Sequence, residues 1–222
     1  DNNLSAETNE KLEAIAEGWN AEPGYKLLVY QDRKGVPPQL KEIVNENGMN
    51  TERLIEEYPE ENPAARDVLA RVIGTTTSLY PSSSYGLLLF SHASGWLPKG
   101  ALGNPGSRSI VTDGKNEMEL SDFAEAIPDH TFDYILFEAC FMAGIEVAYE
   151  LRNKANYILA SSAEIISPGF TPVYTGAINS LFSRNLNYFG QLYFKYIYAQ
   201  TGYRRSATLS VIKTSELTPL AN

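Results

Sequence analysis

Two apolar runs of the sequence each end just before a residue that can carry chemistry. The run Tyr85-Gly-Leu-Leu-Leu-Phe-Ser91 leads into His92, and the run Phe132-Asp-Tyr-Ile-Leu-Phe-Glu-Ala139 leads into Cys140. Short apolar runs of this kind predict buried strands of a parallel sheet. Side chains at the carboxyl ends of neighbouring parallel strands converge on one crevice. This is how an α/β protein presents a nucleophile and its base.

His92 and Cys140 are about 50 residues apart, which leaves room for one crossover connection between two strands of the same sheet. Taken singly, a cysteine is often a buried structural residue and a lone histidine is often a core or surface group. Their joint placement at two strand ends favours a functional pair. We therefore predict that Cys140 is a nucleophile and that His92 is its general acid and base.

Small residues follow the histidine, and a helix-forming run follows the cysteine. His92 begins the segment His92-Ala-Ser-Gly-Trp96, whose backbone N–H groups can closely approach a substrate carbonyl. The N–H groups of Ala93 and Cys140 are the predicted oxyanion donors. Residues 145–151 form a good helical run, and we expect the positive end of that helix to lower the pKa of the Cys140 thiol.

At these residues the chain resembles the clostripain family of cysteine peptidases, which belong with caspases, legumains and gingipains to one caspase-like fold group. The family pairs a His-Gly-x-Gly-Trp segment with an Asp-x-Cys-x-Met segment. This chain has His92-Ala-Ser-Gly-Trp96 and Glu138-Ala-Cys-Phe-Met142, so Ala93 replaces the usual Gly and Glu138 the usual Asp. A histidine about 50 residues before the cysteine is also the caspase order. The resemblance covers residues 26–174.

The resemblance implies an α/β fold, a three-layer caspase-like sandwich with a mostly parallel central sheet. It also implies a cysteine endopeptidase with a Cys–His dyad that acts on peptides or proteins and cleaves after Arg or Lys. Glu138 shares a sheet face with Cys140, so its carboxylate can pair with a basic P1 side chain, or it can orient the loop. Ser161, Ser162 and Glu164 end the next strand and are the predicted side wall of the site.

Two further properties follow from the resemblance. Related proteins often mature by an internal cut, and the Pro- and Gly-rich loop over residues 97–106 contains Lys99 and is followed by Arg108. We expect processing there. Related proteins are also commonly exported by anaerobic bacteria, so we expect export directed by a signal that residues 1–222 do not contain.

Two other classes of function stay open. The first is a catalytically inactive binding module that kept the fold, which Ala93 and Glu138 favour because they depart from the family pattern. The second is a Cys–His acyltransferase or amidase, which the two motifs alone do not exclude. His130, the other histidine, lies in a predicted turn, and we expect it at the surface.

Composition limits the partners of the chain. It has 222 residues, 43% of them hydrophobic and 20% charged, which is enough for one α/β domain over residues 1–222. Residues 1–25 are expected to be a peripheral segment, and the protein can continue after residue 222. A formal charge of −9 without a basic run excludes a nucleic-acid footprint, and no apolar window is long enough to span a membrane. We predict a monomer without cofactor or metal; the single cysteine forms no internal disulfide.

The remaining elements follow from periodicity and punctuation. We predict a first central strand over residues 26–30 and loop or weak edge structure over 31–61. A helix over 64–77 should begin at Pro63, with Asn62 as its cap. The other expected elements are helices at 5–16, 120–127, 145–151, 173–182 and 188–201, strands at 108–113, 157–162 and 207–212, and a loop over the crevice at 167–172.

Overall fold

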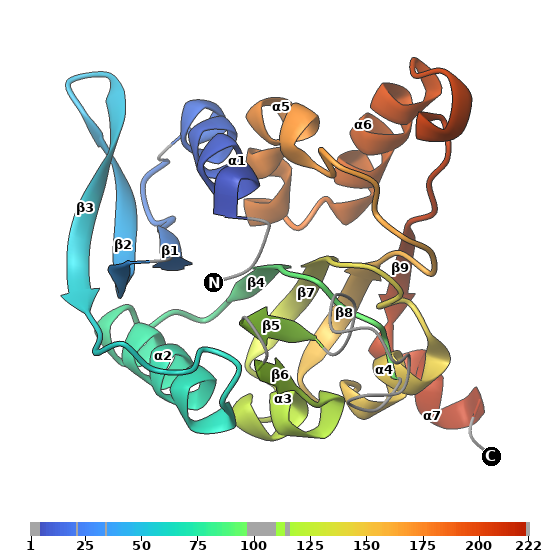
Figure 1. Cartoon of the computed structure of the whole chain (residues 1–222), viewed down its shortest axis with the longest axis horizontal. Coiled ribbons are helices and arrows are strands. Elements are labelled where there is room, and N and C mark those ends of the chain that lie inside the picture. Colours follow the sequence, from blue (N-terminus) through green and yellow to red (C-terminus); the bar gives the residue numbers. More distant parts are fainter. Residues whose placement is uncertain (1–4, 21, 34, 97–109, 114–115, 221–222) are drawn as a thin grey trace. The chain divides into compact units, whose positions relative to one another are not determined.

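The computed structural model describes residues 5–20, 22–33, 35–96, 110–113 and 116–220 (Figure 1). The chain forms two compact units: unit 1 comprises residues 1–61 and 167–205, and unit 2 comprises residues 62–166 and 206–222. Most of the predicted processing loop, with Lys99 and Arg108, lies outside the described residues. A single domain over residues 1–222 stays a prediction.

Unit 2 is built on a four-stranded sheet in the order β4, β7, β8, β9. The strands β4 (Gly86–Phe90), β7 (Phe132–Glu138) and β8 (Ala155–Ala160) are parallel, and β9 (Ser210–Lys213) is antiparallel to β8. In β7 every residue except Asp133 is buried, as expected for an apolar run inside a parallel sheet. The strands predicted before His92 and Cys140 are confirmed.

Helices and a short hairpin complete unit 2. The core contains fully buried Phe123, Ile135, Phe137, Met142 and Val147. The other elements are α2 (Arg66–Leu79), β5 (Val111–Asp113), β6 (Asn116–Met118), α3 (Leu120–Ala126), α4 (Ile145–Glu150), η2 (Thr214–Glu216) and α7 (Leu217–Leu220).

The predicted start of α2 is wrong. Helix α2 begins at Arg66, not at Pro63. The Asn62 side chain accepts a hydrogen bond from the Ala64 N–H at 2.9 Å, and the Asn62 carbonyl accepts one from the Ala65 N–H at 3.0 Å. Asn62 therefore closes a turn that precedes the helix. Asn62 stabilises this turn, so it is not the N-cap of α2 that the sequence pattern predicted.

Unit 1 combines a three-stranded antiparallel sheet with helices. Its strands β1 (Leu27–Arg33), β2 (Val36–Glu46) and β3 (Met49–Glu57) are paired in that order. Helix α5 (Thr171–Phe182) packs against both α1 (Ser5–Gly18) and α6 (Leu186–Tyr198), and η1 (Gly202–Arg204) follows α6. Buried Leu12, Trp19 and Ile43 pack with Phe182 in one apolar cluster.

The sheet of unit 1 overturns two predictions. Residues 26–30 do not form a central strand of the parallel sheet, because β1 pairs with β2 in the separate antiparallel sheet. Residues 31–61 are not mainly loop, because they hold the long hairpin of β2 and β3. The hairpin turn has Asn47 at φ 54° and Gly48 at φ 84°, the backbone that an Asn-Gly pair favours between two strands.

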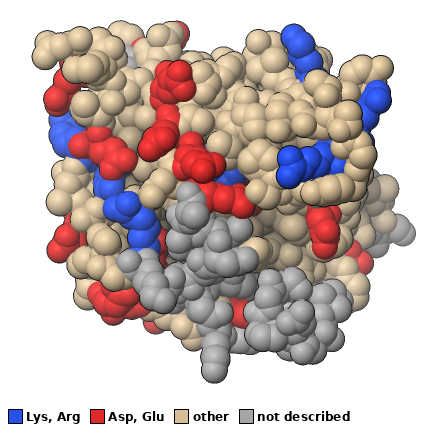
Figure 2. Space-filling view, turned by 45° about the horizontal axis from the view of Figure 1, so that its top comes forward, with Lys and Arg blue, Asp and Glu red and all other residues tan. Residues whose placement is uncertain are grey.

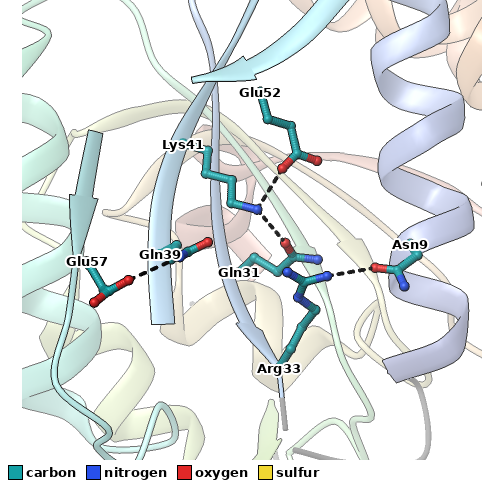
Figure 3. Close-up of polar contacts among 7 residues, drawn as sticks. All are labelled: Asn9, Gln31, Arg33, Gln39, Lys41, Glu52 and Glu57. Atoms are coloured by element: carbon teal, nitrogen blue, oxygen red, sulfur yellow. Dashed lines mark hydrogen bonds and ion pairs between the residues drawn. The ribbon is translucent and has the colours of Figure 1, made fainter. Parts of the chain in front are cut away.

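Polar contacts within this sheet explain why a charged sequence forms strands (Figure 3). Lys41 is 7% exposed, and its Nζ contacts Glu52 Oε2 at 2.6 Å and Gln31 Oε1 at 3.2 Å. Gln39 Nε2 donates to Glu57 Oε2 at 3.2 Å in the same way. Cross-strand pairs of this kind stabilise a sheet without an apolar alternation pattern. Pro37 and Pro38, which favoured the loop interpretation, lie at the start of β2, where proline is tolerated.

No helix within the described ranges has both the length and the apolar character needed to cross a bilayer.

Candidate functional site

His92 and Cys140 follow two strands that are hydrogen-bonded neighbours. In the register of β4 and β7, Phe90 lies opposite Glu138, and the Ser91 N–H donates to the Glu138 carbonyl at 3.5 Å. His92 and Cys140 each lie two positions beyond the Phe90–Glu138 pair. The structure therefore brings both predicted residues to the same edge of the sheet, on adjacent strands.

The turn that carries the histidine touches the turn that carries the cysteine. Gly95 has a φ of +71°, and an ideal Cβ built on it would lie 2.6 Å from the Phe141 carbonyl oxygen. Real Cβ atoms do not approach an oxygen this closely, so only glycine fits without a shift of the backbone. The small-residue segment after His92 thus allows close approach to the cysteine turn.

A third loop, residues 161–165 after β8, holds the cysteine turn in place. The Phe141 N–H donates to the Ala163 carbonyl at 3.1 Å, and the Ala143 N–H donates to the Ser161 carbonyl at 2.9 Å. The Ile165 N–H donates to Cys140 Sγ at 3.4 Å. Phe141 itself is left-handed, with φ 62°, a conformation that is uncommon for a bulky residue and that concentrates at functional sites.

The Cys140 thiol is half-buried, and burial raises its pKa. The hydrogen bond from the Ile165 N–H acts in the opposite direction, and the negative charge of Glu164 raises the pKa further. The prediction of a lowered thiol pKa is wrong. Helix α4 begins only at Ile145 and has six residues, so its dipole is weak.

The two predicted oxyanion donors, the N–H groups of Ala93 and Cys140, stay a prediction. Ala93 is buried beside the core of unit 2 and Cys140 leaves the end of β7. Within the described part of the chain, neither the Ala93 N–H nor the Cys140 N–H donates to another backbone group. The described non-glycine residues with positive φ are Asn47, His130, Phe141 and Arg184, so Ala93 is not strained by its Cβ.

The other predicted site residues differ in exposure. Glu138 is 2% exposed, so its carboxylate lies inside unit 2 at the end of β7. Ser161 is fully buried, whereas Ser162 and Glu164 are exposed. Of the three predicted side-wall residues, only Ser162 and Glu164 therefore face solvent beside the cysteine turn.

Ser161 instead stabilises the loop of residues 161–165, which contacts Cys140. Its Oγ donates to the Ala163 carbonyl at 2.9 Å, accepts from the Ala163 N–H at 3.1 Å and lies 2.8 Å from Thr208 Oγ1. The Ser162 N–H also donates to Thr208 Oγ1 at 3.2 Å. Thr208 was not predicted, because nothing in its sequence neighbourhood marks a residue that hydrogen-bonds to the loop after β8.

Three large apolar side chains are exposed around the cysteine turn, and the sequence analysis assigned none of them a role. Trp96, Phe141 and Ile145 are 53%, 41% and 53% exposed. The Trp96 Cδ1 atom lies 3.7 Å from the position of an ideal Cβ on Gly144, so the indole is next to the start of α4. Exposed apolar groups beside a nucleophile offer contact area for a ligand.

His130 is exposed, has a φ of 58° and donates its N–H to the Asn153 carbonyl at 2.6 Å, which confirms the predicted surface turn. On the face shown in Figure 2, the acidic side chains and the Lys and Arg side chains each lie in several separate groups. Among the described residues no group of three or more His, Cys, Asp and Glu side chains is arranged to hold a metal ion.

With this geometry in place, comparison with known proteins identifies the family. The sequence profile of the clostripain family matches residues 1–222, and the chain belongs to that family. Clostripain from Hathewaya histolytica is 26% identical over 206 residues, which is 77% of this chain and 38% of clostripain.

Two solved structures are similar over 100% of this chain. A secreted C11 cysteine protease from Bacteroides thetaiotaomicron, in complex with an irreversible peptide inhibitor, has a TM-score of 0.85 and 35% identity. An inactive zymogen C11 protease from Parabacteroides distasonis has a TM-score of 0.85 and 33% identity. The chain spans 65% and 61% of these two proteins, so it corresponds to less than two thirds of each relative. The likeness confirms the predicted α/β fold class and the family resemblance.

Proposed function

We propose that this chain carries the catalytic centre of a cysteine endopeptidase, with Cys140 as the nucleophile and His92 as the general acid and base. The observation that carries the proposal is the register of β4 and β7, in which both residues follow one opposed pair of strand ends. The contact between Gly95 and Phe141 supports it, because it joins the two turns. Membership of the clostripain family supports the same reaction class.

The chemistry follows from the environment of the sulfur. Because burial raises the pKa of the Cys140 thiol, a base must remove its proton as the substrate binds. His92 takes that proton, and the thiolate attacks the scissile carbonyl. The N–H groups of Ala93 and Cys140 hold the resulting oxyanion, and losing one such donor costs about 2.7–4 kcal/mol in other enzymes. His92 then protonates the leaving amine and activates water for deacylation.

The alternative of an inactive binding module rested on Ala93 and Glu138. Ala93 is not among the residues with positive φ, so the exchange of glycine for alanine carries no backbone strain. Glu138 lies at the end of β7 with a buried carboxylate, a position suited to orienting the loop. Neither departure from the family pattern thus argues against catalysis.

We assign the predicted preference for Arg or Lys at P1 to the exposed carboxylate of Glu164. Its negative charge already acts on Cys140, so it is close enough to attract a basic side chain beside the nucleophile. Ser162 completes this side of the site. The buried carboxylate of Glu138 is less suited to a direct pair, because a substrate cation would have to be desolvated to reach it.

A panel of fluorogenic peptides that differ only at P1 tests the specificity. We expect Glu164→Gln to lower kcat/KM for Arg and Lys peptides about tenfold, and to leave a Leu peptide unchanged. Glu150→Gln, an exposed exchange on α4, is the matched control. Equal cleavage after Arg, Leu and Asp by the wild type would refute the basic preference.

Labelling with a thiol-directed peptidyl probe tests the function itself. We expect the wild type to be labelled at Cys140 and the Cys140→Ala variant to stay unlabelled. Mass spectrometry of a peptide substrate then distinguishes peptide-bond hydrolysis from acyl transfer or amide release. A wild type that is folded but neither labelled nor active would point to a binding module.

Processing and export belong to the same proposal. The similar Parabacteroides distasonis structure is an inactive zymogen, which supports activation of this protein by processing. We place the cut near Lys99 or Arg108, in the Pro- and Gly-rich segment of the sequence. The similar Bacteroides thetaiotaomicron protease is secreted, which supports export of this protein. A monomer without cofactor is the form in which we expect it to act.

A further inference from the structure

Unit 1 contains a pocket that the proposed catalytic site does not use. Its volume is about 410 Å³, and it is formed by the segment that follows α1, by α5 and by the beginning of α6. It is lined by Trp19, Glu22, Tyr25, Gly176, Asn179, Ser180, Phe182, Ser183, Asn185 and Tyr188. All ten residues belong to unit 1, so the pocket is complete within that unit.

Aromatic rings form much of the pocket wall. The Trp19 and Phe182 ring centroids are 4.2 Å apart and tilted by 38°, and Tyr25 meets Phe182 edge-on at 5.6 Å. Tyr25 and Tyr188 are both 43% exposed, so their rings are available to a ligand. Aromatic faces carry negative electrostatic potential and attract organic cations.

Glu22 is the one charged residue among the ten lining residues. Glu22 supplies a carboxylate whose Oε1 accepts from the Asn20 side-chain amide at 3.1 Å, and no Lys or Arg is among the ten lining residues. Four lining residues come from the last turn and C-cap of α5, and neither α5 nor α1 has a basic residue in its last turn. The C-terminal ends of both helices carry partial negative charge, and Arg184 follows the C-cap of α5 outside the pocket lining.

The beginning of α6 also borders the pocket, and a side chain of the protein itself already caps it. Asn185 and Tyr188 are at the positive end of the α6 dipole, but the Tyr188 N–H already donates to Asn185 Oδ1 at 3.1 Å. The wall opposite is held in place by Asn179. Its Nδ2 donates to the Gly18 carbonyl at 2.6 Å, and its Oδ1 accepts from the Asn20 N–H at 3.0 Å. These contacts tie the pocket residues after α1 to α5.

We propose that this pocket binds the positively charged side chain of a Lys or Arg residue in a peptide. The aliphatic stem packs on Phe182 and on the exposed rings of Tyr25 and Tyr188, and the charged head pairs with Glu22. The pocket is a peptide-binding site made of different residues from the Cys140 site. Its occupancy does not depend on catalysis.

Fluorescence of Trp19 tests the proposal without an activity readout. The protein has two tryptophans, so a Cys140→Ala, Trp96→Phe variant reports on Trp19 alone and does not cleave the probe. The probe is acetyl-Gly-Arg-Gly-amide, and the matched neutral probe carries citrulline in place of arginine. Glu22→Gln is added to remove the charge, and Glu13→Gln, an exposed exchange on α1, is the control.

We expect a saturable change in Trp19 fluorescence with the arginine peptide. Citrulline and Glu22→Gln should each weaken binding about fivefold or more, and Glu13→Gln should leave it unchanged. Matching unfolding midpoints of the two glutamate variants establish that the pocket is intact. Equal affinity for arginine and citrulline, equal affinity in Glu22→Gln, or no saturable change up to about 10 mM probe would each overturn the proposal. Because the nucleophile is absent, inactivity of the wild type leaves this test unaffected.

Discussion

Replacing Gly95 with alanine tests the contact between the histidine and cysteine turns. Gly95 has φ +71°, and an added Cβ would lie 2.6 Å from the Phe141 carbonyl oxygen. Left-handed backbone costs an alanine about 1–2 kcal/mol. Overpacking adds about 1–3 kcal/mol when the neighbour must move. We therefore expect Gly95→Ala to lower the free energy of unfolding by about 2–5 kcal/mol.

Gly48→Ala is the matched control for backbone strain. Gly48 has φ +84° in the turn between β2 and β3, and no atom lies within 4 Å of its ideal Cβ. This variant should pay only the left-handed cost of about 1–2 kcal/mol. Urea unfolding followed by circular dichroism gives the stability of both variants relative to the wild type.

Activity separates the two variants further. The oxygen that Gly95→Ala would displace belongs to the residue directly after Cys140. A displacement of about 1 Å in a catalytic group can cost about 100-fold in rate, so we expect a loss of that order in kcat/KM. Gly48→Ala should keep wild-type kcat/KM. If Gly95→Ala loses no more stability than Gly48→Ala and keeps its activity, the two turns do not touch as described.

Three further predictions concern the cysteine loop and processing. Glu164→Gln removes a negative charge that raises the pKa of Cys140. Alkylation of the thiol by iodoacetamide should therefore reach half its maximal rate at a lower pH than in the wild type. An unshifted pH profile, or the same shift in the control Glu150→Gln, contradicts this prediction. Ser161→Ala should lower the free energy of unfolding by about 1–3 kcal/mol, because the Ala163 carbonyl and Thr208 Oγ1 lose their hydrogen-bond partner. Replacement of the exposed Ser162 by alanine should lower it much less. Equal losses in the two variants argue against the Ser161 hydrogen-bond network. Incubation of the wild type beside Cys140→Ala, with sequencing of any new N-terminus, should give a cut after Lys99 or Arg108 in the wild type alone; full-length wild type that turns over peptide rules out a need for self-cleavage.

The sequence predicted the part of the site that depends on strand ends. The apolar runs of β4 and β7 are long enough to identify buried strands, and both end two residues before a reactive side chain. Adjacent parallel pairing then fixes the level at which the two strands end, which is why the sequence alone placed His92 and Cys140 at one edge of the sheet. Rules of sheet topology carry this step.

The missed features depend on contacts between distant segments. The pKa of Cys140 follows mainly from burial of the thiol and from interactions with Glu164 and Ile165, which no pattern around the cysteine reveals. Thr208 reaches Ser161 from the segment before β9. The sheet of unit 1 was missed for another reason: Pro37 and Pro38 argued for a loop, although the Asn47–Gly48 pair is a hairpin signal in the same segment. In β2 and β3, polar pairs between the strands stabilise the sheet despite Pro37 and Pro38.

The most direct test of the central claim is a double-mutant cycle on His92 and Cys140. We measure kcat/KM of one fluorogenic Arg peptide for the wild type, His92→Ala, Cys140→Ala and the double variant, with circular dichroism to verify the fold. Residues that act as one unit lose nearly all activity together, so each single variant should be as inactive as the double variant. A single variant that keeps more than about a tenth of wild-type activity, or a double variant far less active than either single one, would contradict a Cys–His dyad.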